Sequence, residues 1–296
     1  MKKIKGFLQL MRPANIITSV SDVLAGVAIS GFLFEATFQT NYMAPLALLC
    51  ISTMGLYGGG VVFNDVFDQA LDKVERPERP IPRGLVTIKE ATVLGILLLL
   101  TGIITALLVS NLSGFLAVSI AIAALLYNKF SKHHPIAGPL NMGLCRGLNL
   151  LLGISIVTTA VFEWWFLAFV PIIYIAAITM ISRGEVHGGS KRTLYLAGLL
   201  YCIVIVAILL LSFTKGMFLW TIIFLLPFAW MIFTALIKAI HIPAPHNIGK
   251  AVKAGVIALI LMNGAWAAAF GMIGLAFLII LLLPLSLWLA KIFAVT

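Results

Sequence analysis

Apolar residues occupy the chain in long runs, and short polar connections separate one run from the next. The runs approach the ~20 residues that an α-helix needs to cross the hydrocarbon core of a bilayer. This pattern predicts an all-α fold, a polytopic bundle of ten transmembrane helices, or of nine if the last run does not cross. No long polar stretch remains outside the membrane, so we expect one membrane domain over 1–296. The expected spans are 14–33, 43–63, 91–110, 114–127, 139–160, 165–182, 193–212, 217–237, 254–272 and 274–290.

Lysine and arginine are concentrated in alternate connections between these runs. Because loops rich in these residues stay in the cytoplasm, the connections that carry them are predicted to be cytoplasmic, and an even number of spans places both termini inside. No small-residue cleavage site follows the basic N-terminus, so we expect no cleaved signal peptide and an integral protein of a bacterial inner membrane. The basic segments are 2–12, 64–90, 128–138, 183–192 and 238–253, and the opposite connections carry only Lys215.

The composition excludes several other classes of protein. With 62% hydrophobic and 10% charged residues, the chain is too apolar for a soluble domain. Its net charge of +10 could suggest nucleic acid as a partner, but the topology accounts for the basic connections, so no nucleic-acid binding is expected. The three cysteines lie in apolar runs without the spacing of metal ligands, and we expect neither disulfides nor a zinc site.

The polar segment that follows the second run holds three of the four aspartates in the chain. On a helix, Asp65, Asp68 and Asp72 would share one face, where like charges repel by roughly 0.2–0.5 kcal/mol per neighbouring pair. A cation or basic partner should therefore lie between them. Mg²⁺ takes carboxylate oxygens and bridges them to phosphate groups, so Asn64 and the three aspartates are candidate Mg²⁺ and diphosphate ligands. The alternative is a solvated helix end.

A strap punctuated by prolines, residues 76–84, follows these aspartates, and its three prolines should hold it extended. Its arginines, Arg76, Arg79 and Arg83, could neutralise the aspartates or bind phosphate oxygens bidentately. Together, the aspartates and arginines predict a site for a diphosphate at the membrane surface.

A second polar set surrounds the fifth run, with Lys129 and Lys132 before it and Asn141 and Arg146 within it. A charge such as that of Arg146 at membrane depth is costly unless it is paired or faces a cavity, so we expect it to face a cavity near the diphosphate. The alternative is that Arg146 extends to the cytoplasmic interface and binds no ligand.

Two further polar residues lie within predicted spans. Asp22 should face the interior of the bundle, where it could meet Arg146, line an acceptor pocket, or make only a structural hydrogen bond. For Asn263 a hydrogen bond between packed helices is the preferred interpretation.

The pattern Asn-Asp-x-x-Asp-x-x-x-Asp from Asn64, followed by Arg-Pro-x-Arg-Pro-Ile-x-x-Gly from Arg76, resembles the first signature of the UbiA superfamily of intramembrane prenyltransferases. The resemblance implies about nine transmembrane helices around a lipid-accessible cavity. It also implies a prenyl diphosphate bound through Mg²⁺ at two aspartate-rich cytoplasmic loops, the first of which corresponds to 64–90.

The second loop, 183–192, departs from the pattern of the family because it contains no aspartate. Glu185 is its only acid and could hold Mg²⁺ with help from His187, or Arg183, Lys191 and Arg192 could neutralise the diphosphate directly. The alternative is an ordinary basic loop. This loop, together with Glu-Arg-Pro-Glu-Arg-Pro-Ile-Pro in the first, resembles the EboC-type branch of UbiA-like proteins.

The sequence therefore predicts an Mg²⁺-dependent prenyltransferase that acts on a prenyl diphosphate and an unidentified aromatic or lipid acceptor. In the expected mechanism, the three aspartates hold the metal while Arg79, Arg83 and Arg146 stabilise the leaving group. Two alternatives remain. One is a non-catalytic isoprenoid or lipid carrier with a degenerate second metal site, and the other is a transporter, for which broken helices should be more obvious.

Overall fold

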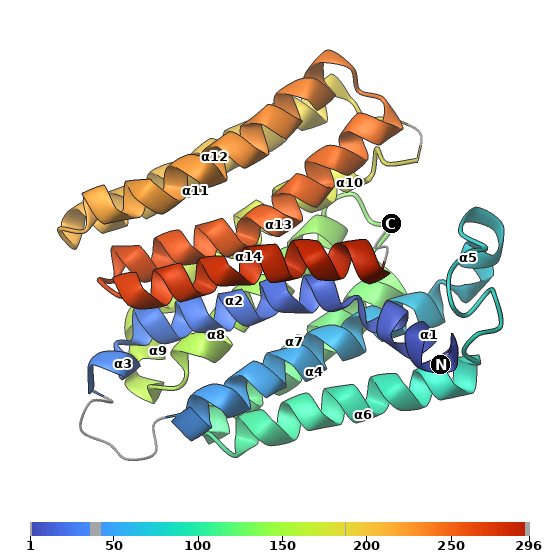
Figure 1. Cartoon of the computed structure of the whole chain (residues 1–296), viewed down its shortest axis with the longest axis horizontal. Coiled ribbons are helices and arrows are strands. Elements are labelled where there is room, and N and C mark those ends of the chain that lie inside the picture. Colours follow the sequence, from blue (N-terminus) through green and yellow to red (C-terminus); the bar gives the residue numbers. More distant parts are fainter. Residues whose placement is uncertain (1, 36–42, 187, 294–296) are drawn as a thin grey trace.

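The computed structural model describes residues 2–35, 43–186 and 188–293, and every regular element in these ranges is a helix. Long helices lie side by side along most of the molecule, and the short helices α1 and α5 lie at one end of the bundle (Figure 1). The elements are α1 (Lys2–Met11), α2 (Pro13–Ser30), α3 (Phe32–Glu35), α4 (Met43–Phe67), α5 (Gln69–Glu75), α6 (Ile88–Leu107), α7 (Asn111–Leu126), the π-helical turn η2 (Tyr127–Ser131), α8 (Ala137–Ile154), α9 (Thr158–Trp164), the 3-10 turn η3 (Trp165–Ala168), α10 (Phe169–Ser182), α11 (Lys191–Thr214), α12 (Phe218–His241), α13 (Pro245–Ala269) and α14 (Ile273–Phe293).

Nine segments of the described chain are long and apolar enough to cross a membrane, and they correspond to nine of the ten predicted spans. The remaining predicted span is α8, which is less apolar because it carries Asn141, Arg146 and Asn149. It packs against α2, α7 and α10, so protein rather than lipid surrounds much of it. With α8 included, both ends of the described chain come to the same side of the bundle (Figure 1).

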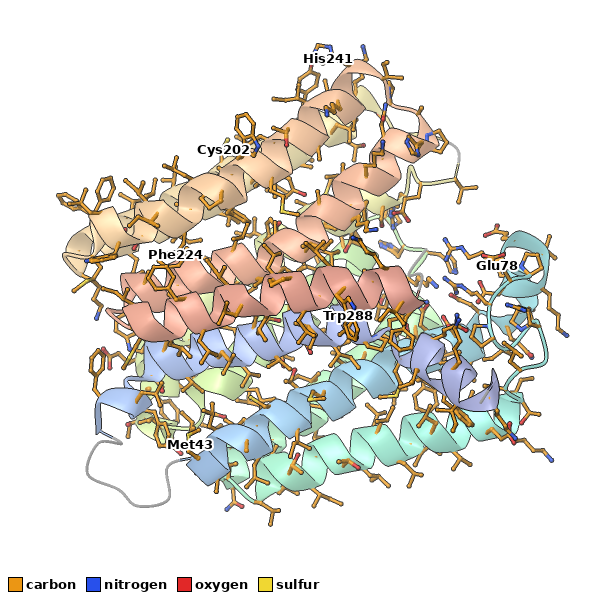
Figure 2. All side chains as sticks on the ribbon, in the orientation of Figure 1. Met43, Glu78, Cys202, Phe224, His241 and Trp288 are labelled. Carbon is orange, nitrogen blue, oxygen red and sulfur yellow. The ribbon has the colours of Figure 1, made fainter. Side chains whose placement is uncertain are left out.

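The outer surface of the bundle is suited to lipid. Hydrocarbon side chains project outward along the outer helices, including those near Trp288, whereas nitrogen- and oxygen-bearing groups gather at the end near Glu78 (Figure 2). We call this the basic end, and it comprises α1, α5 and the described residues 128–136, 183–186 and 188–190. It corresponds to the side predicted to be cytoplasmic. An apolar band with charges gathered at one end fits a multi-pass membrane protein.

Helices α2 and α8 pack unusually close to each other where they cross in the bundle. A Cβ atom on Gly26 would lie 2.4 Å from the Leu150 carbonyl oxygen, and one on Gly153 would lie 2.3 Å from that of Val23. Neither helix could therefore carry a side chain at the crossing, and small residues let membrane helices pack this closely. The close contact brings the polar residues one to two turns away on the two helices, Asp22 and Arg146, within bonding distance.

Helix α1 ties the basic end together through its apolar face. Leu10 is fully buried in a small core with Val62 of α4, with Ile81 of the strap and with Val86 just after it. The strap was expected to be extended, but it folds into consecutive turns, with a hydrogen bond from the Arg83 backbone N–H to the Arg79 carbonyl. Prolines restrict their own φ angles and remain compatible with turns, and burial of apolar strap residues favours this compact path.

Candidate active site

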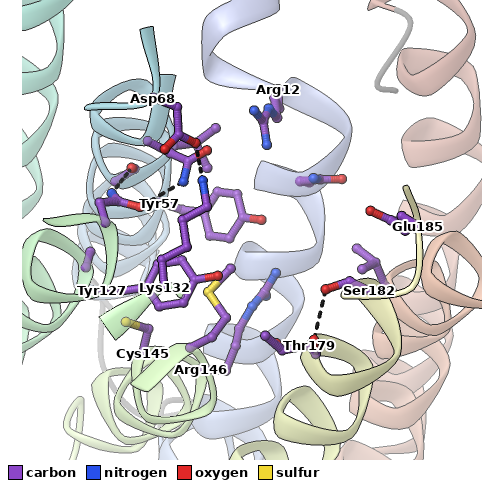
Figure 3. A pocket seen from close by; sticks show the side chains of 18 of the residues that line it. Arg12, Tyr57, Asp68, Tyr127, Lys132, Cys145, Arg146, Thr179, Ser182 and Glu185 are labelled. Atoms are coloured by element: carbon purple, nitrogen blue, oxygen red, sulfur yellow. Dashed lines mark hydrogen bonds and ion pairs between the residues drawn. The ribbon is translucent and has the colours of Figure 1, made fainter. Parts of the chain in front are cut away.

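A cavity of about 490 Å³ opens at the basic end and extends between α4, α7, α8 and α10 (Figure 3). Its inner part has apolar and aromatic walls that include Leu56, Tyr57, Ile120 and Tyr127. Charged groups of both signs also line the cavity, most of them toward the basic end. The basic ones are Arg12, Arg76, Arg79, Lys132, Arg146 and Arg183, and the acidic ones are Asp68, Asp72, Glu75 and Glu185.

Asp65 and Asp72 lie on a common side, as the sequence predicted, because both carboxylates bind Nη1 of Arg79. α4 ends just before Asp68 and α5 begins just after it, but the Asp68 N–H donates to the Asn64 carbonyl and the Asp72 N–H donates to the Asp68 carbonyl, so the helical path continues across the break. Asp68 and Asp72 line the cavity, whereas Asp65 is buried behind the lining. The expectation that positive groups lie between the carboxylates holds, because each of the three is paired with a basic side chain.

Arg12 and Arg79 neutralise the carboxylates of Asp65 and Asp72. Arg12 Nη2 lies 2.6 Å from Asp65 Oδ1, and Arg79 Nη1 lies 3.1 Å from the same oxygen and 2.7 Å from Asp72 Oδ2. Arg12 joins α1 to α2 with a left-handed φ of 51°, a conformation that costs a non-glycine residue roughly 1–3 kcal/mol. The strained backbone at Arg12 aims its side chain at the aspartates.

A π-helical turn completes the opposite wall of the cavity. In η2, Asn128 accepts a 3.0 Å hydrogen bond from Asn64 Nδ2 and donates a 2.8 Å bond to the Gly60 carbonyl. Just beyond this turn, Lys132 pairs with Asp68. Single π turns often mark functional sites. This one brings the amide of Asn128 against Asn64 and the ammonium group of Lys132 against Asp68.

The second loop contributes one acid and one base to the cavity. Glu185 is half-buried, and burial raises the pKa of its carboxyl group while the nearby Arg76 opposes this shift. Arg183 donates from its guanidinium to the His134 carbonyl, which ties this loop to the connection before α8. His187, the predicted helper of Glu185, lies outside the described residues. Lys191 and Arg192 are exposed at the start of α11 and do not line the cavity.

Arg146 lies at the inner end of the cavity and does not extend to the interface. It is 6% exposed and pairs with Asp22, with 2.6 Å between Nη1 and Oδ2. Asn263 donates to the other oxygen of Asp22 over 2.7 Å, so this amide binds a charged group and does not only join two packed helices. Of the interpretations left open for Asp22, the structure supports the pairing with Arg146.

Three more predicted site residues also lie away from the cavity. Arg83 is exposed on the strap, and Lys129 is exposed with its ammonium group 5.2 Å from the ring of Phe130. Asn141 hydrogen-bonds Ser131 across the start of α8. Their helix or turn positions direct them outward or toward a neighbouring polar side chain, which residue spacing alone does not reveal.

Several cavity residues were not predicted. Arg12 belongs to the N-terminal basic segment, which was attributed to topology alone, and its position directly before Pro13 was the available signal. Tyr57 lies within an apolar run, and Tyr127 and Asn128 lie at the end of another, and neither pattern separates cavity residues from packing or interface residues.

The donor chemistry of Asp68, Asp72 and Asn64 fits Mg²⁺. Among the residues that the structure describes, no group of three His, Cys, Asp or Glu side chains converges on one point. Mg²⁺ does not require such a group, because it keeps several waters and is commonly held by one or two carboxylates plus the phosphates of a substrate. The two cavity-lining aspartates supply those carboxylates, and Arg76, Arg79 and Lys132 lie close to them for phosphate oxygens.

Comparison with known sequences places this architecture in a family. The model of the UbiA prenyltransferase family matches residues 23–241. The digeranylgeranylglyceryl phosphate synthase of Sulfurisphaera tokodaii is 27% identical over 267 residues, which cover 85% of this chain and 91% of that protein. The enzyme of the same name from Ignicoccus hospitalis is 32% identical over 191 residues, 63% of this chain and 59% of the relative.

Solved structures share the fold. One described as a digeranylgeranylglyceryl phosphate synthase in membranes superposes with a TM-score of 0.67 at 23% identity and covers 93% of this chain and 100% of that chain. A UbiA homologue from Archaeoglobus fulgidus bound to GPP and Mg²⁺ gives a TM-score of 0.59 at 16% identity, with 91% and 99% covered. These likenesses confirm the predicted UbiA-like helical bundle.

The relatives also bear on two narrower expectations. The organisms named are archaeal, so they do not support the predicted bacterial inner membrane, whereas an integral multi-pass protein agrees with the spans. Assignment to the EboC-type branch stays a prediction. The match over most of the chain, together with the shared fold, confirms the predicted superfamily: the chain belongs to the UbiA prenyltransferase family.

Proposed function

We propose that this membrane protein transfers a prenyl group from a prenyl diphosphate to a hydroxyl group of a lipid that carries glyceryl phosphate. The observation that carries this proposal is the cavity, in which Asp68 and Asp72 adjoin basic side chains at one end and apolar walls continue inward. The name of the relatives, digeranylgeranylglyceryl phosphate synthase, describes a product with two geranylgeranyl groups on glyceryl phosphate, which supports this acceptor class. The homologue bound to GPP and Mg²⁺ supports the donor class.

The diphosphate of the donor would lie at the end of the cavity that holds Asp68. Asp68, Asp72 and Asn64 would hold Mg²⁺, which neutralises charge on a diphosphate leaving group. Arg76 and Arg79 would bind phosphate oxygens, since guanidinium groups match phosphate geometry bidentately. The prenyl chain would extend along Leu56 and other apolar walls, which exclude water from the reacting carbon.

The reaction breaks the bond between C1 of the prenyl group and the diphosphate oxygen, and it forms an ether bond between C1 and the acceptor oxygen. Positive charge develops on the allylic carbon as the diphosphate leaves, and Tyr57 and Tyr127 place aromatic rings on the cavity wall, where such rings attract cations. The acceptor hydroxyl must lose a proton. Glu185 would take it, because burial raises its pKa toward the range in which a carboxylate is an effective base.

One observation favours the carrier as a second candidate. Asp65, Asp68 and Asp72 are each paired with a basic side chain, and the second loop offers Glu185 as its single acid. A protein that only carries a lipid would bind a prenyl diphosphate through the basic groups, with no turnover and little dependence on Mg²⁺.

Purified protein in nanodiscs, given radiolabelled geranylgeranyl diphosphate and a panel of acceptors, separates these candidates. The panel contains a single-chain prenyl glyceryl phosphate, the same lipid without phosphate, and a hydroxylated aromatic acid. The proposal predicts label in a two-chain glyceryl phosphate. Label in the aromatic product would overturn the acceptor class, and tight donor binding without any product in all three mixtures would favour the carrier.

A further inference from the structure

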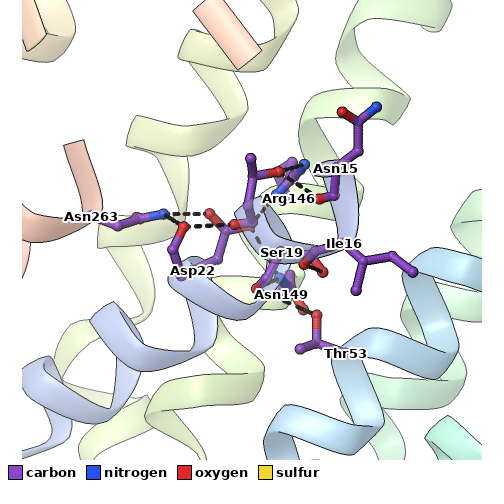
Figure 4. Close-up of polar contacts among 10 residues, drawn as sticks. Asn15, Ile16, Ser19, Asp22, Thr53, Arg146, Asn149 and Asn263 are labelled. Atoms are coloured by element: carbon purple, nitrogen blue, oxygen red, sulfur yellow. Dashed lines mark hydrogen bonds and ion pairs between the residues drawn. The ribbon is translucent and has the colours of Figure 1, made fainter. Parts of the chain in front are cut away.

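A buried ion pair lies at the inner end of the cavity, about halfway along two helices, and only its arginine lines the cavity. Arg146 of α8 and Asp22 of α2 meet at 2.6 Å, and their side chains are only 7% and 2% exposed (Figure 4). Asp68 lies toward the opposite end of the cavity, with Tyr57 in between (Figure 3). The ion pair is therefore separate from the group of aspartates assigned to the diphosphate.

Both oxygens of the Asp22 carboxylate accept hydrogen bonds. Oδ2 accepts from Arg146 and, over 3.1 Å, from Asn149, while Oδ1 accepts from Asn263 over 2.7 Å. Asp22 does not itself line the cavity. Its surroundings therefore fit a fixed counter-ion for Arg146 better than a metal ligand or a base, because each of those roles would require breaking these bonds.

Arg146 does line the cavity, and its orientation is fixed on three sides. Nη1 binds Asp22, Nη2 donates to Thr18 Oγ1 over 2.8 Å, and the guanidinium carbon lies 4.8 Å from the centre of the Tyr57 ring. A guanidinium carries five N–H donors, and the bonds to Asp22 and Thr18 together with the contact to Tyr57 leave some of them unused. The cavity adjoins the group, so a ligand oxygen can reach these.

A purely structural role explains this arrangement poorly. Replacing a buried ion pair with well-packed apolar residues is often neutral or stabilising, and ionisable residues inside the membrane most often serve a function. Because Asp22 balances the charge of Arg146, the inner end of the cavity attracts a ligand through directed hydrogen bonds and not through net charge. Oxygen atoms of a lipid head group fit this requirement, and a hydrocarbon chain does not.

We propose that Arg146 binds head-group oxygens of the acceptor at the inner end of the cavity, and that Asp22 and Asn263 are positioning residues that fix its guanidinium. This inference rests on the proposed function. It assigns Arg146 to the acceptor and leaves the diphosphate of the donor to the end with Asp68 and Asp72.

The test measures KM separately for geranylgeranyl diphosphate and for a single-chain prenyl glyceryl phosphate in nanodiscs, with thermal unfolding of each variant recorded in parallel. Arg146→Lys keeps the charge but loses the planar fork, so acceptor KM should rise by about 10-fold or more while donor KM changes by less than about twofold. Asn263→Leu removes a donor to Asp22 without touching the cavity, and it should raise acceptor KM about 3-fold or more through Arg146. Ser21→Ala is the matched control, because it removes the other hydrogen bond of Asn263, 2.8 Å long, and leaves the one to Asp22.

The outcomes distinguish this inference from the function on which it rests. A rise in donor KM with unchanged acceptor KM would assign Arg146 to the diphosphate and overturn the inference alone. Lower thermal stability with both KM values unchanged would also overturn it and leave a structural pair. If the wild-type protein transfers no prenyl group to the glyceryl phosphate lipid, the proposed function fails, and this inference fails with it. Asp22→Asn is a further variant, and Arg146→Lys and Asn263→Leu suffice should it not fold.

Discussion

Arg79 donates a 2.7 Å hydrogen bond to the carboxylate of Asp72, and both side chains are less than 10% exposed. The strap is therefore bound directly to the aspartate-rich segment that precedes it. A ligand that approaches Asp72 from the cavity meets the guanidinium of Arg79 at the same place. This arrangement suits a site that binds a phosphate and its counter-ion together.

Asp68 and Asp72 are predicted to act differently from Asp65. Asp68→Asn or Asp72→Asn should lower kcat/KM for the prenyl diphosphate by about 100-fold or more, equivalent to ~2.7 kcal/mol, because these carboxylates line the cavity. The measurement is transfer of label at several Mg²⁺ concentrations. Glu78→Gln, on the exposed part of the strap, is the control. Equal activity of the Asp68 and Asp72 variants and the wild type would remove the proposed metal ligands.

Asp65 is predicted to stabilise the basic end through Arg12. The pair is only partly exposed, with 21% for Arg12 and 5% for Asp65. A double-mutant cycle with Arg12→Gln and Asp65→Asn should give a coupling free energy of about 1–2 kcal/mol in unfolding experiments in detergent. Additive effects of the two substitutions would show that the contact contributes nothing to stability.

Because of Glu185, the rate of prenyl transfer is predicted to change with pH at values above the usual pKa of a glutamate. Burial raises its pKa, so it gains its proton at a higher pH than an exposed glutamate, whose pKa is about 4.3. As a base it works only when ionised, so kcat should fall as pH drops through the raised pKa. Glu185→Gln, which resembles the protonated form, should be slow and should lose this pH dependence.

The same variant separates two roles for Glu185. If Glu185 is a base, Glu185→Gln should leave the Mg²⁺ dependence of donor binding unchanged. If Glu185 is a metal ligand, the same substitution should weaken Mg²⁺-dependent donor binding. Unchanged kcat in the variant would contradict the proposed base.

Arg146 and Asp22 are predicted to be more costly to separate than to remove together. Asp22→Asn alone leaves a buried guanidinium without its counter-ion and should lower the free energy of unfolding by about 3–5 kcal/mol. The double variant Asp22→Asn with Arg146→Gln should recover a large part of that loss, as measured by thermal unfolding in detergent. A double variant less stable than the sum of the single ones would refute the pairing as the source of the effect.

The positions of the helices were predictable from the sequence because hydrophobicity and loop charge encode them directly. The predicted span over 139–160 was found as α8 even though its composition is less apolar, since the apolar residues around Arg146 still form one run. The strap was predicted less well. Its prolines indicated a break after α5, but whether it would run extended or fold into turns depended on the contacts of Ile81 and Val86 with α1.

The residues of the site were predictable as types but not as partners. Asp68, Asp72, Arg79 and Lys132 all reach the cavity, because acidic and basic residues next to membrane spans are few and their positions informative. The pairing of Arg12 with Asp65 links residues 53 positions apart, and no spacing rule relates them. The link from Arg146 to Asp22 was one of three alternatives that the sequence left open, because the choice depends on how two helices cross, which local patterns do not specify.

The most direct test of the central claim compares the wild-type protein with Asp68→Asn in nanodiscs that contain radiolabelled geranylgeranyl diphosphate and a single-chain prenyl glyceryl phosphate, with and without Mg²⁺. The product is identified by its mass. We predict a two-chain glyceryl phosphate that forms only with Mg²⁺ and whose formation falls by about 100-fold in the variant. Product formed equally well by both proteins, or no product from the wild-type protein under any of these conditions, would contradict prenyl transfer at this site.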